Sequence, residues 1–125
     1  MSGVTLDAGA LIALDRDDRK VLVLLARARE TGARVTLPAT ALAQVVRAPA
    51  RQVRLARLVR QPTTDVVPLG RVDATNVGRL LAASGTADIV DAHVVICARR
   101  ADQHVATSDP DDLRALDPDV RVVRV

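Results

Sequence analysis

Apolar residues along this chain fall into short continuous runs that alternate with longer stretches of helical spacing. Short runs bounded by polar residues, Pro or Gly predict buried β-strands. We expect strands at residues 4–6, 34–37, 65–68, 104–107 and 121–125. Apolar residues three and four positions apart predict helices between these strands. We expect the helices at about residues 8–14, 19–31, 38–46, 49–60, 72–83, 88–98 and 110–116.

Strands that alternate with helices predict an α/β fold, in which a parallel five-stranded sheet carries helices on both faces and so forms three layers. The chain has no repeat, low-complexity tract or linker, so we expect residues 1–125 to form a single domain. Phe, Tyr and Trp are absent, and the core must therefore consist of Leu, Val, Ile and Ala. The same absence excludes recognition of single strands by aromatic stacking.

Residues 88–98 are apolar except for two acids and a histidine, which is the pattern of a buried helix. Asp88 and Asp91 are three residues apart and point to one side of its first turn, and Thr86 is the expected N-cap. Burying an unpaired carboxylate costs several kcal/mol. A divalent cation held by oxygen ligands would compensate both charges. For Asp88, capping of the helix is nearly as good an explanation.

Further acids are predicted at the same edge of the sheet. Asp7 and Asp109 come just after two strands, and open parallel sheets bind ligands at the carboxyl ends of their strands. The helix that carries Asp88 and Asp91 leads into the strand before Asp109, which brings all four carboxylates toward one edge. Their mutual repulsion favours a hard cation such as Mg²⁺ or Mn²⁺. No Cys and His residues have zinc spacing, and Cys97 is expected to be a small core residue.

The net charge is +3, and the charged residues have an unusual composition. Lys20 is the only lysine and Glu30 the only glutamate, so the 18 basic and 15 acidic residues are nearly all Arg and Asp. A GC-rich coding bias gives the same preference, and nucleic acid binding is therefore permitted rather than indicated. No apolar run reaches the roughly 20 residues that span a bilayer. The chain also lacks a signal-peptide pattern at its start, so we expect a cytoplasmic protein without membrane contact.

The order and separation of several motifs resemble the PIN domain. These motifs are Asp7 after the first strand, Asp91 in Asp-Ala-His-Val-Val, and Thr107-Ser108-Asp109. Together they look more narrowly like the VapC-type toxins of type II toxin–antitoxin pairs, and the resemblance covers nearly the whole chain. It implies a Mg²⁺- or Mn²⁺-dependent endoribonuclease that acts on RNA, forms a homodimer and is silenced by a cognate antitoxin protein.

Carried over residue by residue, Asp7, Asp91 and Asp109 match three of the four metal-binding, catalytic acids of that family. The fourth is normally a glutamate, and here that position is Gln44. An amide offers one neutral oxygen and would hold a cation more weakly. Ala8-Gly9 is a second departure, because the family often has Ser or Thr after the first acid. The implied reaction is metal-assisted phosphodiester hydrolysis that leaves a 5′-phosphate and a 3′-hydroxyl.

Several neighbouring residues are candidates for a supporting role. Asp88 would replace the charge missing at position 44, and Asp112 would add to it, although acids are also common in the first turn of a helix. Ser108 or Thr107 would position a phosphate or a water, although such residues near turns are more often local caps. His93 is expected to be a hydrogen-bonded packing residue.

The densest basic run is a series of arginines at helical spacing: Arg47, Arg51, Arg54, Arg57 and Arg60. A solvated helix face is the default interpretation of such a run. Contact with RNA phosphates and contact with an acidic antitoxin segment are the alternatives, and we assign them to Arg47, Arg51 and Arg54.

Two further functions compete with the ribonuclease. A catalytically weak PIN fold that acts mainly as a protein-binding partner is favoured by Gln44. A phosphoacceptor receiver domain also gathers aspartates at strand ends, but it needs a lysine near a late strand, whereas Lys20 lies in an early helix.

Overall fold

The chain alternates strands and helices in a computed structural model that describes residues 3–125. The strands are β1 (Gly3–Leu6), β2 (Arg34–Pro38), β3 (Thr64–Val67), β4 (His104–Thr107) and β5 (Val122–Arg124). The helices before β3 are α1 (Ala8–Asp15), α2 (Arg19–Thr31), α3 (Ala39–Val45), the 3-10 helix η1 (Pro49–Arg51) and α4 (Val53–Arg60). The helices after β3 are α5 (Arg71–Ser84), α6 (Ile89–Ala101) and α7 (Pro110–Leu116).

The five strands form one parallel sheet in the order β3-β2-β1-β4-β5. The chain moves outward from β1 through β2 to β3, and then returns through α5 and α6 to place β4 on the other side of β1. The strand order therefore reverses between β1 and β4. Open parallel sheets bind ligands at such a point, outside the carboxyl ends of the strands. Asp7 directly follows β1 and Asp109 lies just beyond β4, so both acids belong to this point.

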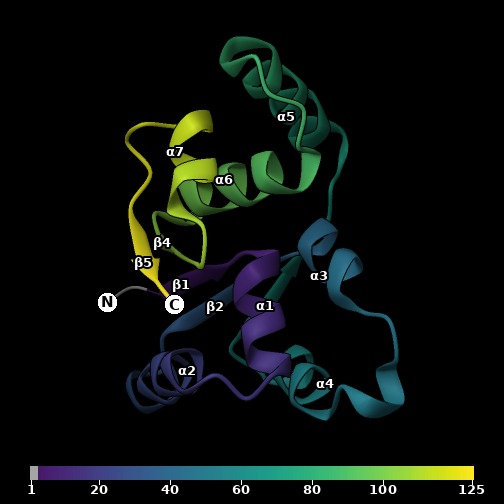
Figure 1. The fold of residues 1–125 in the computed structure, drawn as a ribbon, viewed down its shortest axis with the longest axis vertical. Coiled ribbons are helices and arrows are strands. Elements are labelled where there is room, and N and C mark those ends of the chain that lie inside the picture. Colours follow the sequence, from purple (N-terminus) through teal and green to yellow (C-terminus); the bar gives the residue numbers. More distant parts are fainter. Residues whose placement is uncertain (1–2) are drawn as a thin grey trace.

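Helices cover both faces of the sheet (Figure 1). α6 packs on β1, β2 and β4, and it is itself covered by α5 and α7. On the other side, α1 packs against β1 and β4, α4 packs against β3, and α2 lies beside α1. β1 and the middle of α6 are buried, as their continuous apolar runs predict. The predicted three-layer α/β fold is confirmed.

The second helix shows how local signals set an element's ends. The Asp18 side chain caps α2 by accepting the backbone N–H of Lys20 at 2.9 Å. Gly32 ends the helix in the left-handed conformation, with a φ of 68° that a residue without a Cβ adopts readily. The structure gives this helix the bounds that the sequence predicts.

The helix predicted over residues 49–60 is wrong as a single element. The structure breaks it into η1 and α4 at Gln52, whose side chain is buried. The Gln52 Oε1 accepts the backbone N–H groups of Arg47 and Ala48 at 3.0 and 3.1 Å, and its Nε2 donates to the Val45 carbonyl at 3.0 Å. The side chain thus satisfies backbone groups left open where α3 ends, and this interrupts the helical pattern.

No single helix within residues 3–125 is long and apolar enough to cross a membrane, and only α5 and α6 taken together, across a 112° bend, reach that length. Cys97 lies buried in α6 as a core residue, as predicted, and burial raises the pKa of its thiol to about 11.

Candidate metal centre

Asp7 lies buried between β1 and α1, where it caps the helix. Its Oδ1 accepts the backbone N–H of Ala10 at 2.8 Å, which is an N-cap interaction. Burial raises the pKa of the Asp7 carboxyl above its ordinary value, a hydrogen bond from the Thr107 side chain opposes that shift, and the charge of Asp109 reinforces it. Asp7 therefore has neutral hydrogen-bond donors around it and a like charge nearby.

Thr107, the buried last residue of β4, joins the acids on the two neighbouring strands. Its hydroxyl donates to the Asp7 carboxylate and accepts the backbone N–H of Asp109 at 3.0 Å. Of the two roles considered for Thr107, the structure shows the local cap, because its hydroxyl accepts the backbone N–H two residues on.

The loop that carries Ser108 comes very close to the first turn of α1. A Cβ on Gly9 would lie 2.5 Å from the Ser108 Oγ and 3.4 Å from the Asp7 Oδ1. The exposed Ser108 hydroxyl is therefore near the buried carboxylate.

The two acids at the start of α6 have different surroundings. Asp88 is exposed and is the N-cap of α6, because its Oδ1 accepts the backbone N–H of Asp91 at 2.9 Å. The prediction of Thr86 as the cap is therefore wrong, since the chain enters the helix two residues later. Asp91 is partly buried, and its pKa is raised to about 6, first by burial and then by the charges of Asp88, Asp7, Asp112 and Asp109.

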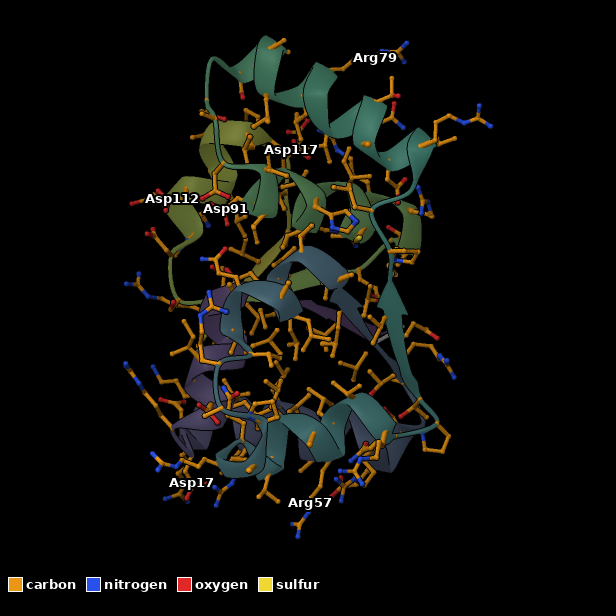
Figure 2. The ribbon with its side chains drawn as sticks, turned by 90° about the vertical axis from the view of Figure 1, so that its right-hand side faces the viewer. Asp17, Arg57, Arg79, Asp91, Asp112 and Asp117 are labelled. Atoms are coloured by element: carbon orange, nitrogen blue, oxygen red, sulfur yellow. The ribbon has the colours of Figure 1, made fainter. Side chains whose placement is uncertain are left out.

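Asp112, in the first turn of α7, lies beside Asp91 in Figure 2. A hydrogen bond with the Asp109 carboxyl raises the pKa of Asp112, and the charges of Asp109 and Asp88 add to that effect. The structure thus brings Asp7, Asp88, Asp91, Asp109 and Asp112 close enough for their charges to interact. We call these five residues the acid cluster.

The acid cluster fits a hard divalent cation by its chemistry, because all its ligand atoms are oxygen. Among residues 3–125, three carboxylates are almost fully buried, at Asp7, Asp73 and Asp117. Asp73 is paired with Arg100 and Asp117 with Arg99, whereas Asp7 has no cationic partner among the described residues. A bound cation would supply the positive partner that Asp7 lacks among these residues.

The carboxylates are not yet in coordinating positions. Within residues 3–125, no group of three His, Cys, Asp or Glu side chains is arranged to hold a metal ion. Binding would therefore need the exposed acids Asp88 and Asp109 to move toward Asp7 and Asp91, and side chains at the surface can make such movements.

Gln44 lies on the last turn of α3, and α3 packs against both α1 and α6. The amide is exposed and makes no hydrogen bond to the acid cluster within the described part of the chain. His93 is fully buried, and its Nδ1 lies 2.7 Å from the Thr40 Oγ1, which confirms the predicted packing role. Burial lowers the His93 pKa, so the ring is neutral at pH 7.

The C-terminal part of the arginine run lies far from Asp91. Figure 2 shows Arg57 at the bottom of the molecule and Asp91 in its upper half. Arg47 donates to the carbonyls of Ala43 and Val46 and so closes the end of α3. Arg51 is exposed on η1, while Arg54 forms an ion pair with Asp17 at 3.2 Å. Arg54 therefore lies at the end of α1 opposite to the end that Asp7 caps.

An open groove of about 290 Å³ lies along these arginines, between α1, α2, β2 and α4. Its floor includes Leu14, Leu22, Leu25 and Leu58, and Arg29, Arg54 and Arg57 line its sides. Sequence reasoning did not identify Arg29, because it is distant in the chain from the arginine run and only the folding of α2 beside α4 brings it there.

Comparison with solved structures gives the class of fold. The chain is similar to a protein in the complex VapBC2 from Rickettsia felis bound to a DNA fragment from its promoter, with a TM-score of 0.71, 10% identity and 98% of both chains covered. It is also similar to a chain of FitAB bound to an IR36 DNA fragment, with a TM-score of 0.66 and 16% identity over 97% of this chain and 94% of that one.

A third similar structure is FitAcB from Neisseria gonorrhoeae, with a TM-score of 0.64, 18% identity and 95% of both chains covered. No family model matches the chain, and no curated protein matches it. At these identities the likeness is one of fold, and it establishes a PIN-like α/β fold over nearly the whole chain.

The raised pKa of Asp91 predicts a measurable effect on stability. The pKa of this carboxyl is about 6 in the folded protein and near 4 in the unfolded chain. The folded protein therefore loses stability as the pH rises from about 4 to about 6. In chelator at pH 7.5, we expect Asp91→Asn to be more stable than the wild type by about 1 kcal/mol, after allowance for solvent screening. The difference should vanish at pH 4, and urea denaturation measures it.

Asp88→Ala is the matched control, because it removes a neighbouring charge together with a helix cap. We expect this variant to be no more stable than the wild type at pH 7.5, because loss of the cap costs about 1 kcal/mol and offsets the relief of repulsion. Equal losses of stability in Asp91→Asn and Asp88→Ala would contradict the claim that the charged Asp91 carboxylate destabilises the fold.

Proposed function

We propose that this protein is the toxin of a toxin–antitoxin pair, a Mg²⁺- or Mn²⁺-dependent endoribonuclease that hydrolyses RNA phosphodiester bonds in the cytoplasm. The observation that carries the proposal is the crowding of five acids at the point of strand reversal in a PIN-like fold. The similarity to chains of VapBC2 and FitAB supports the toxin role. A homodimer is part of the same proposal.

In this proposal Asp7, Asp91 and Asp109 hold the cation, and Asp88 and Asp112 supply further negative charge. A bound ion of this kind lowers the pKa of a water and neutralises charge on the phosphodiester. Thr107 fixes the orientation of the Asp7 carboxylate through its hydrogen bond. The exposed hydroxyl of Ser108 is available to a phosphate or a water beside the acids.

The groove between α2 and α4 is the proposed surface for the antitoxin. Its leucine floor suits an apolar stripe, and Arg29, Arg54 and Arg57 suit acidic residues that flank such a stripe. Arg47 and Arg51 precede α4 in the chain and are candidates for further contacts with acidic residues of the antitoxin. This assigns the arginine run to the protein partner rather than to RNA at the acid cluster.

A protein-binding role with weak catalysis is the second candidate, and Gln44 is the observation that favours it. With an amide in place of the family's glutamate, the site has one less charge on α3. The two candidates differ in whether the purified protein cuts RNA when a divalent cation is present.

Cleavage of RNA tests the proposed function. We expect purified protein with Mg²⁺ or Mn²⁺ to generate new 5′-phosphate ends in total cellular RNA, and sequencing of those ends measures it. Chelator should abolish the cuts, and Asp91→Asn should reduce them at least about 100-fold, because it removes a charged ligand. Cuts that persist in chelator or in Asp91→Asn would come from another nuclease and contradict the proposal.

Restoring the missing charge gives a test in the opposite direction. We expect Gln44→Glu to raise the affinity for Mn²⁺ about tenfold, since a carboxylate then replaces a neutral amide on α3, which packs against α1 and α6. Isothermal titration calorimetry measures the affinity. Gln61→Glu, on the far side of the molecule at the end of α4, is the matched control and should leave it unchanged. An unchanged affinity in Gln44→Glu would exclude position 44 from the site.

A further inference from the structure

A second basic surface, separate from the arginine run, lies between α5 and α6. It is an open hollow of about 430 Å³ whose lining comes from two equally spaced sets of residues. Three lie at positions i, i+3 and i+4 of α5 and three at the same spacing on α6: Asn76, Arg79, Leu80, Ile96, Arg99 and Arg100. We call this surface the α5–α6 arginine groove. One face of each helix thus builds it.

Two of its guanidinium groups are held in place by buried acids. The Arg100 Nη1 donates to the Asp73 Oδ2 at 3.0 Å, and its Nη2 contacts the other oxygen of the same carboxylate. The Arg99 Nε donates to the Asp117 Oδ2 at 3.0 Å. Both arginine side chains are still half exposed, so each keeps N–H donors for a ligand.

The charge that a ligand would meet in the groove is positive. Asp73 and Asp117 are almost fully buried beneath the arginines, whereas the guanidinium groups lie at the surface. Arg79 adds a third positive charge and forms no ion pair within residues 3–125. Arg79 is exposed on α5 (Figure 2). Three arginines against two buried acids leave a net positive charge.

The groove and the acid cluster are connected by α6. Asp91 is in the first turn of this helix and Arg99 is in its last turn. Eight residues separate them, which corresponds to about 12 Å along the helix axis. A nucleic acid strand that reaches the acid cluster can therefore reach the groove within a few nucleotides, since extended single strands advance about 6 Å per phosphate, roughly twice the spacing in duplex DNA.

We propose that the α5–α6 arginine groove binds a backbone phosphate of the RNA strand, away from the bond that is cut. This inference rests on the proposed function for the identity of the strand. Guanidinium groups bind phosphate through paired N–H donors, and the buried acids hold two of them in place before the ligand arrives. The contact needs no metal ion, so it persists in chelator.

The test is binding of a fluorescein-labelled single-stranded RNA, measured by anisotropy in chelator at several salt concentrations. Arg79→Ala removes the arginine of the groove that forms no ion pair among the described residues. It leaves the Arg99–Asp117 and Arg100–Asp73 pairs intact. We expect it to weaken binding about threefold or more and to reduce the slope of log affinity against log salt by about 0.7. Arg27→Ala, an exposed arginine of α2, is the control and should change neither.

The possible results distinguish failure of the groove proposal from failure of the proposed nuclease function. Equal binding by Arg79→Ala and Arg27→Ala would overturn the groove as an RNA contact. Stabilisation by inorganic phosphate that depends on Arg79, without any effect on RNA, would assign the groove to a small phosphate ligand and also overturn it. Arg79-dependent RNA binding by a protein that cuts no RNA with Mg²⁺ would support the groove and contradict only the nuclease.

Discussion

Repulsion among carboxylates at the carboxyl ends of β1 and β4 is the constraint on which the candidate site depends. The strand order reverses between these two strands, and α6 begins at the same edge, so three separate parts of the chain bring acids to one place. Asp91 shows the consequence most clearly, because burial and four neighbouring acids hold its pKa near 6. A fold that keeps such an arrangement without a cation sacrifices stability.

Other buried acids in the same chain show how the fold treats a carboxylate that has only a structural role. Asp73 and Asp117 each receive an arginine from the end of α6, and these pairs hold α5 and the segment after α7 against that helix. Asp7 is equally buried but receives only neutral donors. Asp73 and Asp117 thus hold helices together, whereas Asp7 has no such pairing role, and α6 has an acidic end and a basic end.

Much of this architecture could be predicted from the sequence, because its signals are local. Asp18 and Gly32 define α2, and the strands are continuous apolar runs between breaks. The placement of Asp7 and Asp109 follows from the rule for parallel sheets. The break at Gln52 could not be predicted, since its buried amide serves backbone groups of another helix. The pairing of Arg100 with Asp73 depends on how α5 packs on α6, which periodicity alone does not reveal.

Diffraction from crystals soaked in Mn²⁺ tests the central claim most directly, because the anomalous signal locates the ion without assumptions about activity. The account predicts a peak about 2.1 Å from carboxylate oxygens of both Asp7 and Asp91, with Asp88 or Asp109 drawn toward it. Manganese bound only elsewhere, with Asp7 and Asp91 unliganded at a saturating concentration, would contradict it.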